Sequence, residues 1–328
     1  MSRLSRYKKS LAKFIKDRSC ISKEVPNANM YQIIYNYIKN SDLILSITLL
    51  TTMNNQNKKN NISCQGYYAA AGIELMLTLI TIIEDKNNFT SKYGAEYYST
   101  TINFITLCIY KTFCQNLESV KNGIKDDKLK CIMPNIYTNV MSVINNKLSY
   151  ACLLSDHVFE FTNKKPKNDT LNWYLQENKL LVEEFNKLKQ ISKDSMDKFI
   201  KSRIGAICEV SICIGWYMGC GNERSIRKIR KLAHSLAMLY KISNDFETIE
   251  QDIMNHNNGV STNYVVNYGL QKAYEDYLDN KQKFIEGVMV LDMYTNTVKE
   301  IINYIDQKVD NIIDQTSPDL KSSYSAIQ

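Results

Sequence analysis

Apolar residues recur along this chain at the three- and four-residue spacing of amphipathic helices. The longest apolar runs are Leu43–Met53, Tyr67–Ile83 and Ile204–Tyr217, and only 11 Gly and 4 Pro interrupt the 328 residues. The pattern predicts ten helices, over Tyr31–Asn40, Asp42–Met53, Gly66–Asp85, Ala95–Asn116, Pro134–Ser155, Asn172–Ser192, Met196–Tyr217, Ser225–Asp252, Leu270–Met289 and Met293–Asp314. Polar loops are expected between them, at Asn54–Asn61, Lys86–Tyr93, Thr162–Thr170, Gly219–Glu223 and Asn255–Thr262.

Composition favours one large all-α domain over residues 1–328. Hydrophobic residues make up 44% of the chain, enough for a substantial core, and no shift in composition marks a domain boundary. Residues 1–25 are expected to form a basic arm or a first helix, and residues 315–328 a tail.

The net charge of +7 is spread along the chain, with its densest points in the first 18 residues and at Arg224–Lys231. A solvated helix face is the favoured interpretation of these clusters, and an anionic ligand or surface is the alternative. No nucleic-acid motif accompanies the charge, so a nucleic-acid partner is not expected.

The nine cysteines have irregular spacing and form no CxxC pair. This favours reduced thiols and a cytoplasmic protein. The longest apolar runs fall short of a bilayer's thickness, so the sequence predicts no transmembrane segment.

One polar pattern closes an apolar stretch, LYKISNDFETIEQD (Leu239–Asp252). On a helix, Asn244, Thr248 and Asp252 would lie within an arc of roughly 80°. Amide, hydroxyl and carboxylate oxygens are the ligands that Mg²⁺ takes in proteins. A magnesium site and the polar face of an ordinary amphipathic helix both remain open for this pattern.

A second cluster favours the magnesium interpretation. Glu84, Asp85 and Asn88 end the apolar Gly66–Asp85 helix and share one face. Two helices that end in oxygen ligands can face each other and hold a diphosphate through bridging cations. The Asp126–Asp127 pair has no apolar helix before it and is expected in a solvated loop.

With these motifs the chain resembles the trans-isoprenyl diphosphate synthase superfamily, over roughly Tyr67–Asp314. Glu74 stands ten residues before Glu84, as in the first acidic helix of that family. The segment KSRIGAICEVSICIGW is similar to a helix that contacts the diphosphate there, which places Arg203 at the basic position.

Within the superfamily the second motif resembles (N/D)DxxSxxxE of class I terpene synthases, with Thr248 for Ser and Asp252 for Glu. Chain-elongating relatives bind a second, homoallylic diphosphate with arginine-rich segments. Here the corresponding stretches read YIKNSDLILSITLL and FTSKYGAEYY. Without those cations a second diphosphate would be desolvated with little compensation.

The resemblance therefore implies a terpenoid synthase-like bundle of about ten or more helices around a central apolar cavity. The implied activity is Mg²⁺-dependent ionisation and cyclisation of a linear prenyl diphosphate, most consistent with the C15 farnesyl chain because Leu79 and Ile80 leave moderate space. Three Mg²⁺ ions are expected, with Mn²⁺ able to substitute, and a homodimer is suggested. The implied metal ligands are Glu84, Asp85, Asn88, Asn244, Thr248 and Asp252.

Other roles follow from the same resemblance. Arg203 would contact the diphosphate, while Tyr240 and Trp216 would present aromatic faces to a carbocation, although both residue types are as common in an ordinary core. The loops Lys86–Tyr93 and Met254–Thr262 would act as lids, together with the tail around Lys321. Further substrate contacts are expected from Leu77, Ile80, Thr81 and Lys321.

Two alternatives remain open at this stage: a chain-elongating prenyl diphosphate synthase, and a non-catalytic subunit that regulates one. Zinc or histidine-triad chemistry has no support, because His157, His234 and His256 lack the spacing of ligands or of a triad. The glycines in GWYMGCGNERS follow no strand and predict a helix break.

Overall fold

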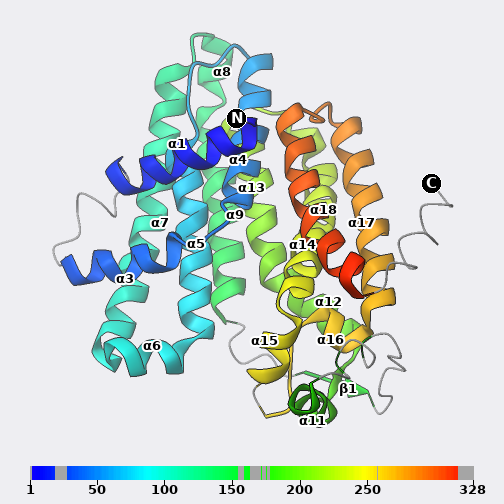
Figure 1. Cartoon of the computed structure of the whole chain (residues 1–328). Helices are drawn as coiled ribbons and strands as arrows, with labels where there is room; N and C mark the ends of the chain where they lie inside the picture. The colour runs from blue at the N-terminus through cyan, green and yellow to red at the C-terminus, as the bar shows by residue number, and fades with distance from the viewer. Residues whose placement is uncertain are drawn as a thin grey trace. The chain divides into compact units, whose positions relative to one another are not determined.

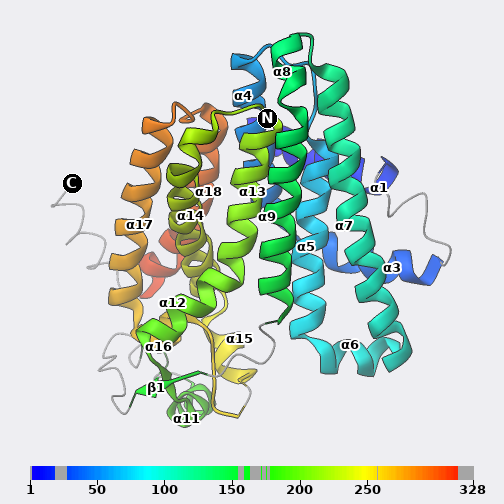
Figure 2. The same cartoon turned by 180° about the vertical axis from the view of Figure 1, so that it is seen from behind.

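The computed structural model describes residues 2–18, 28–153, 159–162, 171, 175, 178–256 and 258–316. These residues are almost entirely helical (Figures 1 and 2), which confirms the all-α class. The strands among them are β1 (Phe161–Thr162) and β2 (Gln190–Ile191), which pair antiparallel.

The chain divides into two compact units. Unit 1 comprises Met1–Asp156, Ala206–Ala233 and Met289–Ile301, and unit 2 comprises His157–Gly205, His234–Val288 and Ile302–Gln328. Helices α13, α14, α17 and α18 each contain residues of both units. One domain over residues 1–328, and a cavity at its centre, stay predictions.

Unit 1 is built around α5 (Tyr67–Glu84), which contacts α1, α3, α4, α7 and α9. α5 and α7 lie side by side and are joined at one end by α6 (Figures 1 and 2). The helices with residues in this unit are α1 (Arg3–Arg18), α3 (Ala28–Ile38), α4 (Ile44–Lys59), α5, α6 (Lys86–Tyr93), α7 (Ala95–Gly123), α8 (Asp127–Cys131), α9 (Met133–Leu153), α13 (Ile204–Met218), η2 (Glu223–Ser225), α14 (Ile226–Glu247), α17 (Leu270–Val290) and α18 (Asn296–Thr316).

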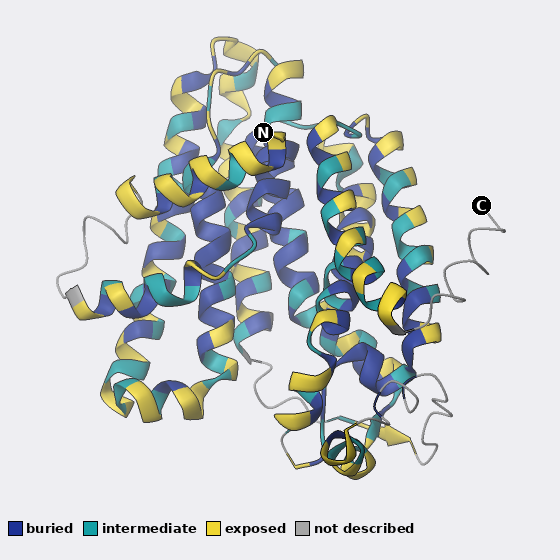
Figure 3. Cartoon of the chain, viewed as in Figure 1, coloured by how far each residue is buried: buried dark blue, intermediate teal, exposed yellow. Residues whose placement is uncertain are grey.

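The core of unit 1 is formed by helices that are buried over most of their length. Residues 44–53 of α4 are all buried, and so is most of α5 (Figure 3). A Cβ atom at Gly215 of α13 would lie 2.7 Å from the carbonyl oxygen of Leu49, so only glycine permits this approach of α13 to α4. The hydroxyl of Ser211 donates to the carbonyl oxygen of Leu45 at 2.6 Å in the same interface.

By length and composition α5 could also cross a membrane, with a mean hydropathy of 1.4. However, 67% of it is buried inside the protein, as is usual for the central helix of a folded core. The cysteines of the described residues are free thiols.

The basic N-terminal segment forms a helix. Ser2 caps α1 by accepting from the Ser5 amide at 3.1 Å, and the carboxylate of Glu300 accepts from the amides of Arg3 and Leu4 at 3.2 and 2.6 Å. One face of α1 packs into unit 1, and the basic side chains of the opposite face are exposed; these are Arg6, Lys9, Lys13 and Lys16. This is the solvated face that the sequence favoured.

Unit 2 contains β1, β2 and several short helices. Its helices are α11 (Lys179–Lys187), α12 (Lys193–Ser202), α15 (Ile249–Met254), α16 (Tyr264–Tyr268) and most of the residues of α14, α17 and α18. α11 packs against α15, and α15 against α16. The helix predicted over Asn172–Ser192 lies partly outside the described residues, and β2 occupies its end.

Two segments predicted as loops are helical. Residues 86–93 form α6 because Phe89, only 1% exposed, packs against the rings of Tyr93 and Tyr98 at 5.1 and 5.8 Å. α4 continues to Lys59 because Asn57 is buried and donates to the carbonyl oxygen of Cys64 at 3.0 Å. In both cases tertiary contacts outweigh the polar local sequence.

Two predicted long helices are broken. The Met196–Tyr217 helix breaks at Arg203, where the backbone adopts φ −94° and ψ −98°. The Ser225–Asp252 helix breaks at Thr248, between α14 and α15. The glycine-rich stretch after Met218 ends α13, as predicted. Asp126 and Asp127 are exposed as expected, although Asp126 caps a short helix, α8.

Candidate functional site

The first acidic cluster lies at the corner between α5 and α6 in unit 1. Glu84 is the last residue of α5 and is exposed, while Asp85 follows it and begins α6. The Asn88 amide donates to Asp85 Oδ2 at 3.0 Å. Burial and the negative charge of Asp85 raise the pKa of Tyr37 to about 12. The structure thus brings together two carboxylates and an amide, as the sequence predicted.

The predicted chain-binding residues lie on the same side of α5 as this cluster. Leu77, Thr81 and Glu84 follow the helical i, i+4, i+7 spacing; Leu77 is half-buried, Thr81 and Glu84 are exposed, and Ile80 lies beside them at 7% exposure. The Thr81 hydroxyl donates back to the carbonyl oxygen of Leu77 at 3.0 Å. Leu77 and Ile80 thus form an aliphatic surface on the side of α5 that ends at Glu84 and Asp85.

Glu74, ten residues before Glu84, is fully buried. Ser46 of α4 hydrogen-bonds to its carboxyl group and also donates to the carbonyl oxygen of Ala70 at 2.9 Å. Burial raises the pKa of Glu74 to about 7, against the hydrogen bonds of Ser41 and Ser46. A protonated Glu74 would donate to Ser46 and leave the Ser46 proton for the carbonyl oxygen of Ala70.

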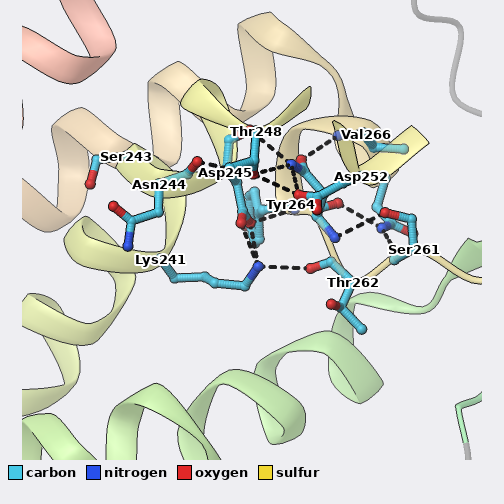
Figure 4. A network of polar contacts seen from close by, with 12 residues as sticks. Lys241, Ser243, Asn244, Asp245, Thr248, Asp252, Ser261, Thr262, Tyr264 and Val266 are labelled. Atoms are coloured by element: carbon cyan, nitrogen blue, oxygen red, sulfur yellow. Dashed lines mark hydrogen bonds and ion pairs between the residues drawn. The ribbon is translucent and has the colours of Figure 1, made fainter. Parts of the chain in front are cut away.

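The second motif does not form one continuous stripe in unit 2. Thr248 has φ −112° and ψ 14° and separates α14 from α15, so the single helix assumed for Asn244, Thr248 and Asp252 is wrong. Thr248 Oγ1 still donates to Asp252 Oδ2 at 2.6 Å (Figure 4). The same Oδ2 accepts from Asn263 Nδ2 at 2.8 Å.

Asp245, which the metal assignment left out, is the centre of this network (Figure 4). Lys241 Nζ donates to both of its carboxylate oxygens, at 2.5 and 2.6 Å, and the Tyr264 amide donates to Oδ2 at 2.7 Å. Lys241 also donates to the carbonyl oxygen of Thr262 at 2.9 Å. Burial raises the pKa of Asp245, and the Lys241 ammonium opposes that shift.

Asn244 faces a second lysine. Lys308 Nζ of α18 donates to Asn244 Oδ1 at 2.9 Å and lies 2.8 Å from the carboxylate of Glu247. Its side chain is only 12% exposed. The amide oxygen predicted to bind magnesium therefore already accepts from an ammonium group.

The remaining predicted residues that the structure describes lie on different helices and have different contacts. Arg203 ends α12 in unit 2, is 7% exposed, and its guanidinium lies 5.9 Å from the ring centroid of Phe199. Trp216 lies in unit 1 and donates from its indole N–H to the carbonyl oxygen of Asn222 at 3.0 Å. Tyr240 is half-buried on α14. Lys321 falls outside the described residues.

The two clusters differ in how well they fit Mg²⁺. Glu84, Asp85 and Asn88 suit one ion that keeps several waters, because one or two carboxylates are common for Mg²⁺. At the second motif, Lys241 and Lys308 stand against Asp245, Glu247 and Asp252, and two positive and three negative charges leave −1. Among the described residues no three His, Cys, Asp or Glu side chains form a metal-binding group.

In this arrangement the two lysine ammonium groups oppose a magnesium ion at the second motif. Two like unit charges 4 Å apart repel by about 4 kcal/mol at the effective dielectric of a protein surface, and a divalent ion doubles that figure. A cation bound by Asn244 Oδ1 would lie beside the Lys308 ammonium. The donor set fits two lysines better than it fits magnesium.

Comparison with known proteins gives the fold. No family model and no curated protein matches the sequence. The geranylgeranyl pyrophosphate synthetase of the archaeon Geoglobus acetivorans matches with TM-score 0.60 at 11% identity, over 94% of this chain and 99% of that one. The chain has the isoprenyl diphosphate synthase fold.

Two further solved structures share this isoprenyl diphosphate synthase fold. The geranyltransferase of Helicobacter pylori, complexed with magnesium and isoprenyl diphosphate, matches with TM-score 0.57 at 12% identity, over 94% of this chain and 96% of that one. A mutant of the heterotetrameric geranyl pyrophosphate synthase of mint matches with TM-score 0.53 at 12% identity, over 92% and 98%. At such identities the fold is established, and the activities remain those of the neighbours.

Sequence reasoning missed four residues of the second site: Lys241, Asp245, Asn263 and Lys308. The Lys241–Asp245 pair had a visible signal, because a lysine and an aspartate four apart on a helix contact each other. The contact of Lys308 with Asn244 joins residues 64 positions apart and has no local signal.

Proposed function

We propose that this protein acts on a prenyl diphosphate, and that chain elongation is its activity. The fold match carries the proposal, because it extends over almost the whole length of enzymes named for making geranyl and geranylgeranyl diphosphates. Cyclisation was inferred from the Asn244–Thr248–Asp252 pattern, in which Asn244 accepts from Lys308 and Asp252 accepts from Thr248 and Asn263. Elongation is therefore better supported than cyclisation.

The residues of α5 would carry substrate binding. Glu84, Asp85 and Asn88 would hold magnesium, which supplies charge neutralisation to the departing diphosphate when bound. Leu77 and Ile80 would lie along the first carbons of the prenyl chain and exclude water from them. Arg203 as a diphosphate contact and Tyr240 as an aromatic face remain part of the proposal.

Product analysis tests the proposal. The purified chain is incubated with Mg²⁺ and C10, C15 or C20 allylic diphosphates, each with and without the C5 homoallylic diphosphate, and products are identified by mass spectrometry. Longer diphosphates that form only with the C5 unit are expected. Hydrocarbons or alcohols formed without it would identify a cyclase instead.

A second candidate is a non-catalytic subunit of a prenyl diphosphate synthase. The lysines at the second motif favour it, as do the missing arginine-rich segments. Its signature would be no turnover by the chain alone, together with a changed product length or rate when the chain is added to an active chain-elongating synthase. The homodimer suggested by the resemblance also stays a prediction.

A further inference from the structure

Two lysines contact the second acidic motif. Lys241 binds Asp245, and Lys308 binds Asn244 and Glu247. We propose that Lys241 and Lys308 close this motif to divalent cations and serve as its built-in positive charges. The closure concerns metal binding alone and holds whether or not the chain turns over a substrate. It restricts divalent cations to the cluster of Glu84, Asp85 and Asn88.

The closure begins at Asp245, because both of its carboxylate oxygens already accept hydrogen bonds from protein donors. Its side chain is 5% exposed and receives Lys241 on both oxygens and the Tyr264 amide on one of them. A cation would have to displace a lysine that is itself only 17% exposed. Displacement of Lys241 would leave the Asp245 carboxylate buried without a counter-charge, and this cost opposes its replacement by a cation.

The second step is the engagement of Asn244 by α18. Lys308 bridges Asn244 and Glu247, which are three residues apart on α14. One ammonium thus binds both an amide oxygen and a carboxylate, the pair of donors that magnesium would need. Since its side chain is 12% exposed, solvent competes little for this contact.

The third step concerns Asp252 and the segment that follows α15. Asp252 Oδ2 accepts from both Thr248 and Asn263, and Asn263 also donates to the backbone oxygen of Asp245 at 2.8 Å. Lys241 donates to the carbonyl oxygen of Thr262, the residue before Asn263. Thr262, the last residue of the predicted lid Met254–Thr262, and the adjacent Asn263 are therefore held by protein groups.

Mn²⁺ binding to the full chain tests the closure without any substrate. The 10 phenylalanines include Phe89, next to Asn88, and Phe246, next to Asp245. With ¹⁵N-phenylalanine labelling, sub-stoichiometric Mn²⁺ should broaden the Phe89 amide signal. In the variant with Glu84→Gln and Asp85→Asn, which lacks the first cluster, Mn²⁺ should leave the amide signals of both Phe89 and Phe246 sharp. Broadening of Phe246 in that variant would overturn the proposal.

Variants give an independent measurement through free Mn²⁺, read from its EPR signal. Asp252→Asn should bind as many ions per chain as the unmodified protein, whereas Glu84→Gln with Asp85→Asn should lose them. A loss with Asp252→Asn, in a variant whose circular dichroism is unchanged, would show that the second motif does bind metal and would overturn the proposal.

Removal of the closing charge should open the motif. Lys308→Met should gain Mn²⁺ binding by at least one ion per chain, because Asn244 and Glu247 then lack the ammonium group that they share. The matched control is Lys281→Met, which removes a lysine paired with Asp306 at 2.9 Å elsewhere in unit 2 and should gain none. Equal binding by the two variants would contradict the role of Lys308.

Discussion

The hydroxyl of Ser46 contacts the carboxyl group of Glu74 in the centre of unit 1, between α4 and α5. Serine has one proton to donate, and the Ala70 carbonyl oxygen lies within reach of it. The arrangement favours a protonated Glu74, whose pKa burial raises to about 7.

The stability of the protein should therefore fall as pH rises between about 4.5 and 7. The folded state holds the Glu74 proton more tightly than the unfolded chain does, so its advantage is complete below pH 4.5 and is lost as pH passes 7. A shift from 4.5 to about 7 corresponds to roughly 3 kcal/mol. Urea unfolding of Glu74→Gln and the unmodified protein should agree near pH 4.5 and favour the variant at pH 8.

The exposed Glu118→Gln change on α7 provides the control for this pH dependence. It should leave the pH profile of unfolding unchanged. If Glu74→Gln kept the full pH slope, another group would be responsible.

Replacement of Asp85 by Asn should reduce the kcat/KM for an allylic diphosphate roughly 100-fold, the usual effect of removing one preorganised electrostatic group. The Mg²⁺ concentration for half-maximal rate should rise as well, because one of two carboxylates is gone. Steady-state kinetics at several Mg²⁺ concentrations measure both effects. Asp127→Asn on the exposed α8 is the matched control, and an equal loss there would remove the assignment.

Lys241→Met should destabilise the protein by about 3–5 kcal/mol, since it leaves Asp245 buried and uncompensated. The free energy of unfolding from urea titration measures the loss. Lys241→Met combined with Asp245→Asn should recover most of it, because no buried charge is then left alone.

A second lysine–aspartate pair with the same four-residue spacing provides the control for Lys241→Met. Lys283 pairs with Asp279 on α17, with both side chains more than half exposed. Lys283→Met should cost less than about 1 kcal/mol. Comparable losses for Lys283→Met and Lys241→Met would mean that burial does not set the difference.

Gly215→Ala should destabilise unit 1 by about 1–3 kcal/mol, because the added methyl group meets the α4 backbone at 2.7 Å. Thermal unfolding measures the loss. Gly287→Ala within α17 should instead be neutral or stabilising by up to about 1 kcal/mol, since alanine favours the helix. A harmless Gly215→Ala would show that α4 and α13 can move apart freely.

Periodicity was enough to predict the long helices. α5 and α17 match their predicted ranges within two residues, because each has a continuous apolar face and few residues that break helices. The helical state of residues 86–93 could not be predicted, since it depends on Phe89 packing against rings from other segments.

The candidate site was predicted in part for a related reason. Glu84, Asp85 and Asn88 are neighbours in the chain, so local spacing was sufficient to group them. The second motif required knowledge of which residues approach from elsewhere, and Lys308 and Asn263 come from other segments. A pattern of oxygen atoms does not reveal whether an ammonium or a metal ion will meet them.

The contact of Glu300 with the amides of Arg3 and Leu4 has a consequence for biosynthesis. Helix α1 obtains this acceptor only after the 296 positions that separate Leu4 from Glu300 have been translated. Before that, Ser2 accepts from the Ser5 amide, and the amides of Arg3 and Leu4 do not yet have the Glu300 carboxylate as their acceptor. This contact of α1 with α18 therefore forms only after α18 has been synthesised.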